Sequence, residues 1–170
     1  WEDEPAWGCW RLERRVHLNP GSEGGPAFHL EFSPSPDPDG GSPSTPPATS
    51  TDDTTGLWEA GDLVQVEPPA EPTRPREYSI ASIPEDGRLH LLVRQQTRED
   101  GTLGHASGWL TQGLDVGSLA RMRLRAHRAF RLGDNAARPP LLIGNGTGLA
   151  GLRAHLKARA AGGLGPNWLI

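Results

Sequence analysis

Apolar and polar side chains alternate in short runs over the first three quarters of the chain. In one run Phe28, Leu30 and Phe32 fall on one side. His29 and Glu31 fall on the other, as in an antiparallel strand that buries one face. Other strand-like runs bounded by turn residues lie at 14–18, 63–66, 77–82, 89–95 and 120–126. This spacing predicts an antiparallel β-barrel or sandwich up to about Leu132.

A different pattern follows a polar linker at 133–140. The continuous apolar run 141–143 is typical of a buried parallel strand, and a glycine-rich turn and a helical stretch at 148–160 come after it. Trp168 would begin the next strand. We therefore expect a first unit at 1–132 and, at 133–170, one strand-helix-strand unit. Because so short a unit cannot fold as an independent α/β domain, we expect the chain to be a piece of a longer protein.

Composition narrows these expectations. The 22 glycines and 17 prolines favour short strands and turns over a helical bundle. Residues 33–56 are almost devoid of apolar side chains, which predicts a flexible surface insertion. The alternation of Arg121, Arg123 and Arg125 with apolar residues predicts the solvated face of a strand.

Charge and cysteine content exclude several classes of protein. A net charge of −4 argues against general nucleic-acid binding, which needs a basic surface. Cys9 is the only cysteine, so the chain holds no disulfide framework, and a reducing compartment is expected. No apolar run reaches the roughly 20 residues of a membrane helix. The six histidines show no spacing that groups them as metal ligands, and we expect structural or surface roles for them.

Three segments carry candidate chemistry. In a strand Arg76 and Tyr78 point to the same side, where a guanidinium and an aromatic ring could meet one ligand, and Ser79 adds a hydroxyl. We expect a short helix at 107–112, for which Ser107 is a suitable cap. The small residues of 104–107 would leave free amides at its start. The glycines of 144–151 would let backbone amides approach a phosphate.

Each segment alone also has a structural interpretation: an ordinary strand with a half-exposed tyrosine, a helix cap, and a tight turn. Their order along the chain changes the balance. The segments Arg-x-Tyr-Ser-Ile-Ala-Ser (76–82), Gly-x-Ala-Ser (104–107), Arg-Ala-Phe-Arg-Leu (128–132) and Gly-x-Gly-Thr-Gly-x-Ala (144–150) occur in the order seen in one family. Over most of 57–170 the chain resembles the ferredoxin-NADP reductase superfamily, of the sulfite reductase flavoprotein and cytochrome P450 reductase type.

The resemblance implies an FAD-binding antiparallel β-barrel, followed by the first part of a parallel α/β NADP-binding domain. It implies that Arg76 contacts an FAD phosphate, that Tyr78 stacks on the isoalloxazine and that Ser79 lies near its reactive edge. The other residues that it implies in cofactor binding are Leu92, Val93 and Arg94 along the FAD, Gly104, His105, Ala106 and Ser107 at the pyrophosphate, and Gly146, Thr147 and Gly148 at NADPH.

By the same resemblance, electrons would pass from NADPH through FAD to an FMN-bearing flavodoxin-like domain or to a haem or iron-sulfur partner. We expect the protein to be cytoplasmic. No catalytic side chain is assigned, because the flavin supplies the redox chemistry. The alternative is a non-catalytic flavin- or nucleotide-binding module. One departure is Gly151, which stands where relatives usually have proline. The chain also ends before the segments that would bind the 2'-phosphate.

Overall fold

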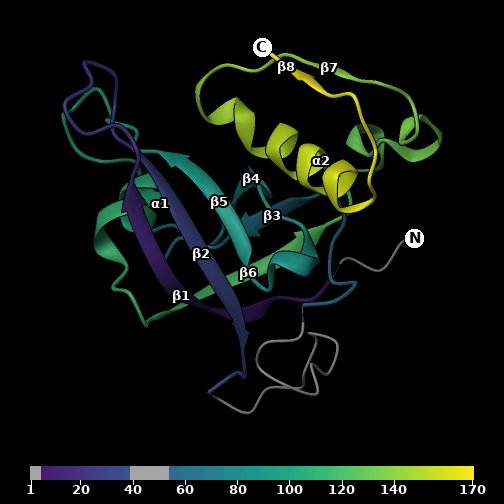
Figure 1. The fold of residues 1–170 in the computed structure, drawn as a ribbon. Helices are drawn as coiled ribbons and strands as arrows, with labels where there is room; N and C mark the ends of the chain where they lie inside the picture. The colour runs from purple at the N-terminus through teal and green to yellow at the C-terminus, as the bar shows by residue number, and fades with distance from the viewer. Residues whose placement is uncertain (1–4, 39–53) are drawn as a thin grey trace.

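A six-stranded antiparallel barrel forms the larger part of the molecule (Figure 1). The computed structural model describes residues 5–38 and 54–170. The strands are β1 (Gly8–His17), β2 (Ala27–Ser35), β3 (Leu63–Val66), β4 (Arg76–Ser79), β5 (Leu89–Arg94) and β6 (Leu119–Arg125). They follow the order β4-β3-β6-β1-β2-β5, and a bridge between Ile80 and Leu91 joins the two edges. The predicted antiparallel barrel is confirmed.

The alternation along β2 places its apolar face in the barrel. Leu30 and Phe32 are fully buried, whereas Glu31 and His29 point out of the barrel. β1 pairs antiparallel with β2, and its register shifts between Leu12 and Arg14, so the strand carries a bulge. Both strands are longer than the sequence predicted, because turn signals mark only where pairing ends and not how far it extends.

The core is built from residues of all the barrel strands except β4, together with neighbouring loops. Its fully buried members include Leu12, Leu30, Phe32, Val64, Val66, Leu89, Leu91 and Met122. Two tryptophans that are far apart in the sequence, Trp10 and Trp58, meet edge to face with ring centroids 6.5 Å apart. The indole N–H of Trp58 donates to the carbonyl of Ser82 at 3.0 Å, which satisfies its buried polar atom.

Short helical turns connect the strands. They are η1 (Pro84–Asp86), α1 (His105–Gly108), η2 (Trp109–Gly113), η3 (Arg128–Phe130), η4 (Gly133–Asn135) and η5 (Gly146–Gly148). The predicted helix at 107–112 is displaced, since α1 begins at His105 after the cap position Gly104. Ser107 lies inside the helix, and its hydroxyl accepts a hydrogen bond from the amide of Gln96 at 3.0 Å. The serine thus ties the helix to the preceding loop.

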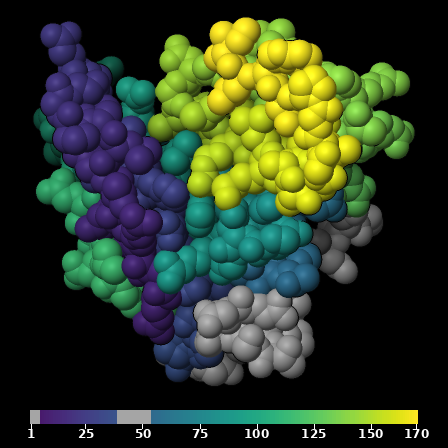
Figure 2. Space-filling view, in the orientation of Figure 1, coloured from purple at the N-terminus to yellow at the C-terminus, as the bar shows by residue number. Residues whose placement is uncertain are grey.

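The second unit is a strand-helix-strand arrangement, as predicted. β7 (Leu141–Leu142) pairs in parallel with β8 (Trp168–Leu169), and α2 (Leu149–Ala161) connects them. The helix ends where Gly163 adopts a left-handed φ of 67°. Figures 1 and 2 show this unit, in green and yellow, resting against β5 on one side of the barrel.

Both ends of the predicted insertion at 33–56 belong to the barrel. Ser33 to Ser35 continue β2, and the buried Thr54 donates from its hydroxyl to the carbonyl of Pro84 at 2.6 Å. The rest of that prediction, at 39–53, lies outside the described residues. Within the described ranges, no helix has the length and apolar character needed to cross a bilayer.

Candidate cofactor-binding site

Two of the three predicted segments meet at one carboxylate. Arg76, at the start of β4, places Nη2 3.3 Å from Oε2 of Glu71, and His105, at the start of α1, places Nδ1 3.1 Å from the same oxygen. Arg98 donates to Nε2 of His105 at 2.8 Å, which leaves the proton on Nδ1 to be donated to Glu71. β4 and α1 therefore present two donors to one anionic oxygen.

Glu71 is held as a carboxylate. Its pKa is lowered, first by the hydrogen bond from His105 and then by Arg74 and Arg76. An oxygen of a phosphate accepts the same charge-assisted hydrogen bonds as an oxygen of a carboxylate. The position of Oε2 thus marks a place where the chain itself stabilises an anion. The donors there, Arg76 and His105, are residues that the resemblance assigns to FAD phosphates.

Tyr78 and Ser79 follow Arg76 along β4. The tyrosine is half-buried and packs against the barrel core, and burial raises the pKa of its phenol to about 12, with Arg76 acting in the opposite direction. The ring is consequently neutral over the physiological range. Across the described part of the chain, the Ser79 hydroxyl has no hydrogen-bond partner. A neutral aromatic ring and an available hydroxyl lie next to each other on the strand.

The three candidate residues of β5 lie in different surroundings. Leu92 is half-buried, whereas Val93 is 1% exposed and belongs to the barrel core, so only its backbone can face a ligand outside. Arg94 reaches the glycine turn of the second unit: a Cβ built on Gly146 would lie 2.9 Å from its Nη2. Within residues 5–38 and 54–170, the Arg94 guanidinium makes no hydrogen bond or ion pair.

Two glycines in the candidate segments are required by their surroundings. A Cβ at Gly104 would lie 2.8 Å from Oγ of Ser107, so a larger residue would displace that hydroxyl. Gly146 adopts a φ of 56° at the start of the turn that leads into α2, with Thr147 and Gly148 completing η5. Amides in the first turn of a helical segment have no acceptor within it. The turn presents such amides beside Arg94.

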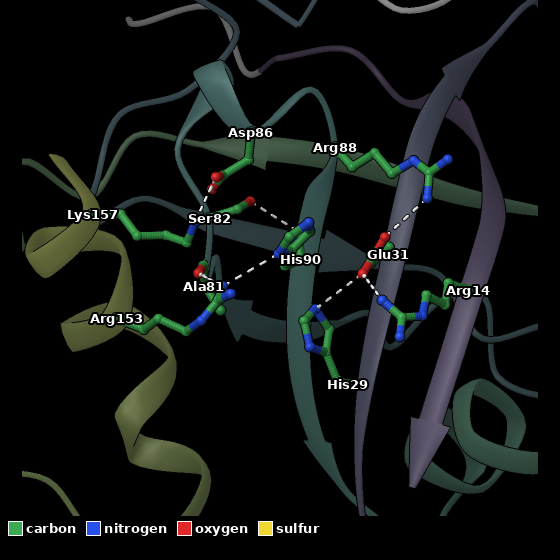
Figure 3. Close-up of polar contacts among 10 residues, drawn as sticks. All are labelled: Arg14, His29, Glu31, Ala81, Ser82, Asp86, Arg88, His90, Arg153 and Lys157. Atoms are coloured by element: carbon green, nitrogen blue, oxygen red, sulfur yellow. Dashed lines mark hydrogen bonds and ion pairs between the residues drawn. The ribbon is translucent and has the colours of Figure 1, made fainter. Parts of the chain in front are cut away.

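The second unit contacts the barrel through two basic side chains of α2 (Figure 3). Arg153 donates from Nη1 to the carbonyl of Ala81 and lies 3.2 Å from Nδ1 of His90, while Lys157 pairs with Asp86. Burial is the main cause that lowers the pKa of His90 to about 4. A neutral imidazole can accept the hydrogen bond from Arg153, which an imidazolium cannot do.

His29, Glu31 and His90 are brought together, although their spacing in the sequence did not group them. Pairing of β2 with β5 places one possible ligand atom from each within 4.8 Å of the others. Spacing along the sequence therefore could not reveal that His29 and His90 lie together. Arg14 and Arg88 both bind the carboxylate of Glu31, and Arg153 contacts His90 (Figure 3). These cations oppose a metal ion, so the cluster fits a structural network better than a metal site.

Sequence reasoning missed Glu71, Asp62 and Arg153. Glu71 lies in a proline-rich loop with no periodic pattern, so nothing in the sequence indicated that Arg76 and His105 meet there. Asp62 directly precedes β3. It is only 3% exposed and pairs with Arg131. This burial depends on a contact between segments that are distant in the sequence. In the sequence itself, the only local indication of its role is that an aspartate follows the glycine of a turn.

Sequence comparison finds relatives among flavoproteins. No family model matches the chain. Sulfite reductase [NADPH] flavoprotein alpha-components from Neisseria meningitidis and Yersinia enterocolitica are 36% and 37% identical to it over 105 residues. The match covers 58% of this chain, but only 17% of the Neisseria protein and 18% of the Yersinia protein. The chain thus corresponds to a small part of these relatives.

Structure comparison identifies the same fold. Ferredoxin-NADP+ reductase from Plasmodium falciparum superposes with a TM-score of 0.72 at 17% identity, over 96% of this chain and 56% of that one. Its H286L mutant gives a TM-score of 0.73 at 18% identity. The barrel and the partial second unit both take part in this likeness, given the share of the chain covered. The chain is thus similar in sequence to sulfite reductase flavoprotein alpha-components, and its fold is that of the ferredoxin-NADP+ reductases.

Proposed function

We propose that the chain is the FAD-binding part, with the beginning of the NADP-binding part, of a flavin-dependent oxidoreductase. The observation that carries this proposal is the anionic oxygen of Glu71 held jointly by Arg76 and His105. Two donors from different elements converge on one point, and both belong to segments that the resemblance assigns to FAD binding. Of the remaining candidates, those on β5 lie next to β4, and the glycine turn at Gly146–Gly148 lies next to β5.

The residues present fit an FAD. Arg76 and Nδ1–H of His105 would hold phosphate oxygens in the place of Glu71, with Gly104, Ala106 and Ser107 forming the backbone of that turn. Tyr78 would offer its neutral ring as a stacking surface. The hydroxyl of Ser79 would donate a hydrogen bond at the edge of the flavin. Leu92 and the backbone of Val93 would line the cofactor along β5.

The glycine turn before α2 would receive the dinucleotide. Gly146 and Thr147 would present amides to phosphate oxygens, while the amide of Gly148 donates to the carbonyl of Asn145 at 3.1 Å and closes the turn. The guanidinium of Arg94 supplies positive charge beside this turn. When bound, the flavin accepts a hydride from the nicotinamide and releases electrons one at a time. The protein would orient the two ligands and fix the charges around their phosphates.

The wider role of the protein is part of the same proposal. The relatives named above are sulfite reductase flavoproteins that use NADPH. We extend to this chain the transfer of electrons from NADPH through FAD to an FMN-bearing domain or to a haem or iron-sulfur partner. A cytoplasmic location accords with the presence of a single cysteine, Cys9, with which the given chain can form no internal disulfide.

Reconstitution with FAD tests the proposal. The purified chain is titrated with FAD, and binding is followed by flavin absorbance and by quenching of flavin fluorescence. We expect saturable binding that Arg76→Ala weakens at least about tenfold, as loss of a charge-assisted hydrogen bond to phosphate does. Arg74→Ala is the matched control, because Arg74 contacts the other oxygen of Glu71 and is 70% exposed.

Two further results separate the alternatives. A chain that is colourless once unbound FAD has been removed, or an Arg76→Ala variant with unchanged affinity, would refute the proposal. If a longer form that continues beyond Ile170 bound FAD but failed to oxidise NADPH with ferricyanide, the non-catalytic binding module would be the correct interpretation. Tyr78→Phe should retain FAD binding while Tyr78→Ala loses it, since the ring and not the phenol makes the stacking contact.

A further inference from the structure

Phe130 joins the barrel to the second unit, outside the candidate cofactor site. It is the last residue of η3, in the segment that leads from β6 to the linker. Its ring lies against the imidazoles of His127 and His155, with ring centroids 5.9 Å and 5.0 Å away. His127 belongs to the same segment, whereas His155 belongs to α2. The side chain of Phe130 therefore crosses the boundary between the two units.

Two glycines make room for Phe130, one from each unit. At Gly151, in the first turn of α2, a Cβ would lie 2.7 Å from Cε1 of the phenylalanine ring. At Gly61, shortly before β3, a Cβ would lie 2.7 Å from its carbonyl oxygen. Atoms that are not bonded do not approach so closely, so a side chain at either position would displace Phe130. The contact between the ring and α2 thus depends on the notch that Gly151 leaves.

The main chain around Phe130 is fastened to the barrel. The amide of His127 donates to Oδ1 of Asp62 at 3.0 Å, and Arg131 binds both oxygens of the same carboxylate at 2.8 Å. Asp62 itself is buried beside β3. Because these bonds hold the residues on both sides of Phe130, the ring projects toward α2 from a fixed base.

The notch at Gly151 lies close to the glycine turn. Gly151 follows Gly148, the last residue of η5, by three positions. The amide of Leu149 donates to the carbonyl of Gly146 across the junction, so η5 continues into α2. A shift of the first turn of α2 would consequently move the glycine turn with it. On the side of β5, the turn faces Arg94, whose Nη2 would lie 2.9 Å from a Cβ at Gly146.

We infer that Phe130 is a positioning residue for the glycine turn. By filling the notch at Gly151, the ring sets how far η5 lies from β5, and with it the place of the Gly146 and Thr147 amides beside Arg94. Phe130 acts through α2 and not by contact with a ligand. The inference rests on the proposed function only in that the turn receives a dinucleotide, since the position of the turn can be measured without any ligand.

Deuterium exchange of the Gly148 and Leu149 amides, followed by NMR without added cofactor, tests the position of the turn. Both amides make hydrogen bonds that close it. In Gly151→Ala the added methyl group displaces the ring or the helix. We expect exchange at least about fivefold faster, although alanine otherwise favours a helix over glycine.

A compensating substitution makes the test specific to Phe130. Leucine has no atom at the position of Cε1, so Gly151→Ala combined with Phe130→Leu should restore the exchange rate to within about twofold. Gly162→Ala is the control, because it makes the same change at the other end of α2. There the nearest atom of the described chain would lie 3.5 Å from an added Cβ, which is an ordinary contact.

Titrations with NADP+ and FAD separate positioning from a general loss of structure. In Gly151→Ala the Kd for NADP+ should rise at least about fivefold while the Kd for FAD stays within about twofold, and adding Phe130→Leu should restore NADP+ binding. An unaltered chain that binds no NADP+ would count against the dinucleotide site of the proposed function. Amide exchange would then decide on Phe130 by itself.

The inference is overturned by exchange that changes less than fivefold in Gly151→Ala, by a double variant that does not restore it, or by equal losses of affinity for FAD and NADP+. Circular dichroism establishes folding of each variant. If Gly151→Ala does not fold, Phe130→Ala decides the same question, because it empties the notch. Exchange at least about fivefold faster at Gly148 and Leu149 then supports the inference, and any smaller change contradicts it.

Discussion

Arg131 holds Asp62 through two parallel hydrogen bonds, Nε to Oδ1 and Nη2 to Oδ2, each 2.8 Å long. The carboxylate also accepts from the amides of Glu59 at 2.9 Å and His127 at 3.0 Å. Burial alone would raise the pKa of Asp62, but these hydrogen bonds outweigh it and lower the pKa. One side chain thus fastens the turn before β3 to the linker that leads to the second unit.

Asp62→Asn should destabilise the chain by about 2–3 kcal/mol, because Arg131 would lose its charged partner in a mostly buried setting. The loss should be largest at neutral pH. A carboxyl with a lowered pKa in the folded state contributes stability above its unfolded pKa of 3.8, and this contribution disappears as the pH falls through the folded pKa. Urea unfolding at pH 7 and pH 3 measures both effects.

Glu59→Gln is the control for that experiment. Glu59 also pairs with Arg131, but its side chain is 66% exposed, and exposed pairs contribute less than about 1 kcal/mol. Equal losses in Asp62→Asn and Glu59→Gln would show that burial of the carboxylate is not what stabilises the contact.

Gly61→Ala should cost more than an ordinary glycine substitution. Gly61 has a φ of 101°, and an added Cβ would lie 2.7 Å from the carbonyl oxygen of Phe130. Gly56 also has a positive φ, 74°, but nothing lies within 4 Å of its Cβ position. We expect about 1 kcal/mol for Gly56→Ala and at least about 2 kcal/mol for Gly61→Ala, measured by urea unfolding. Equal costs would mean that backbone strain alone requires the glycine.

The barrel was predictable because apolar and polar residues alternate along its strands, and this alternation is visible over a few residues of sequence. Phe28, Leu30 and Phe32 indicated which face of β2 is buried, and the turn residues indicated where strands end. The lengths of β1 and β2 were not predictable, because pairing continues wherever a partner strand is available. β4 was expected to reach Ser82, but its pairing with β3 ends at Ser79, and Ile80 bridges to Leu91 instead.

The candidate site was predictable only where residue identity alone indicates chemistry. Arg76, Tyr78 and the glycine turn could be named from the sequence, since guanidinium, aromatic ring and free amides each suit part of a dinucleotide. The contact of Arg76 and His105 with Glu71 could not, because it depends on how a loop folds back between two elements. The same holds for Arg94, which reaches Gly146 only once the second unit packs on β5.

His90→Gln should reduce the acid sensitivity of the fold. The pKa of His90 is lowered to about 4, so between pH 6.5 and about 4 the unfolded chain binds a proton that the folded chain does not. Stability is therefore complete above pH 6.5 and falls as the pH decreases through this range, by on the order of 2 kcal/mol after allowance for solvent screening. Glutamine keeps an acceptor for Arg153 without this proton.

Melting temperatures at pH 7 and pH 5 measure the effect of that substitution. The difference between them should shrink in His90→Gln, although part of it remains because burial also lowers the pKa of His29 and His155. His17→Gln is the control, since His17 is an exposed residue that stacks on Phe28. An unchanged difference in His90→Gln would contradict the proposed neutral contact between His90 and Arg153.

Glu71→Gln should strengthen FAD binding. The carboxylate of Glu71 occupies the donors of Arg76 and His105, so a phosphate must displace it. A neutral amide competes less well for a guanidinium, and the dissociation constant should fall several-fold at low salt. Because added salt screens exposed charges, the difference between Glu71→Gln and the unaltered chain should narrow at high ionic strength.

Glu77→Gln provides the matched control for charge. Glu77 lies beside Arg76 on β4 but pairs with Arg125 at 2.7 Å and accepts from Gln65, on the opposite face of the strand. Its substitution removes the same negative charge without freeing Arg76 or His105. FAD affinity measured by fluorescence quenching should thus change in Glu71→Gln and not in Glu77→Gln. Equal gains would indicate a general effect of net charge, and weaker binding in Glu71→Gln would show that Glu71 positions the two donors for the cofactor.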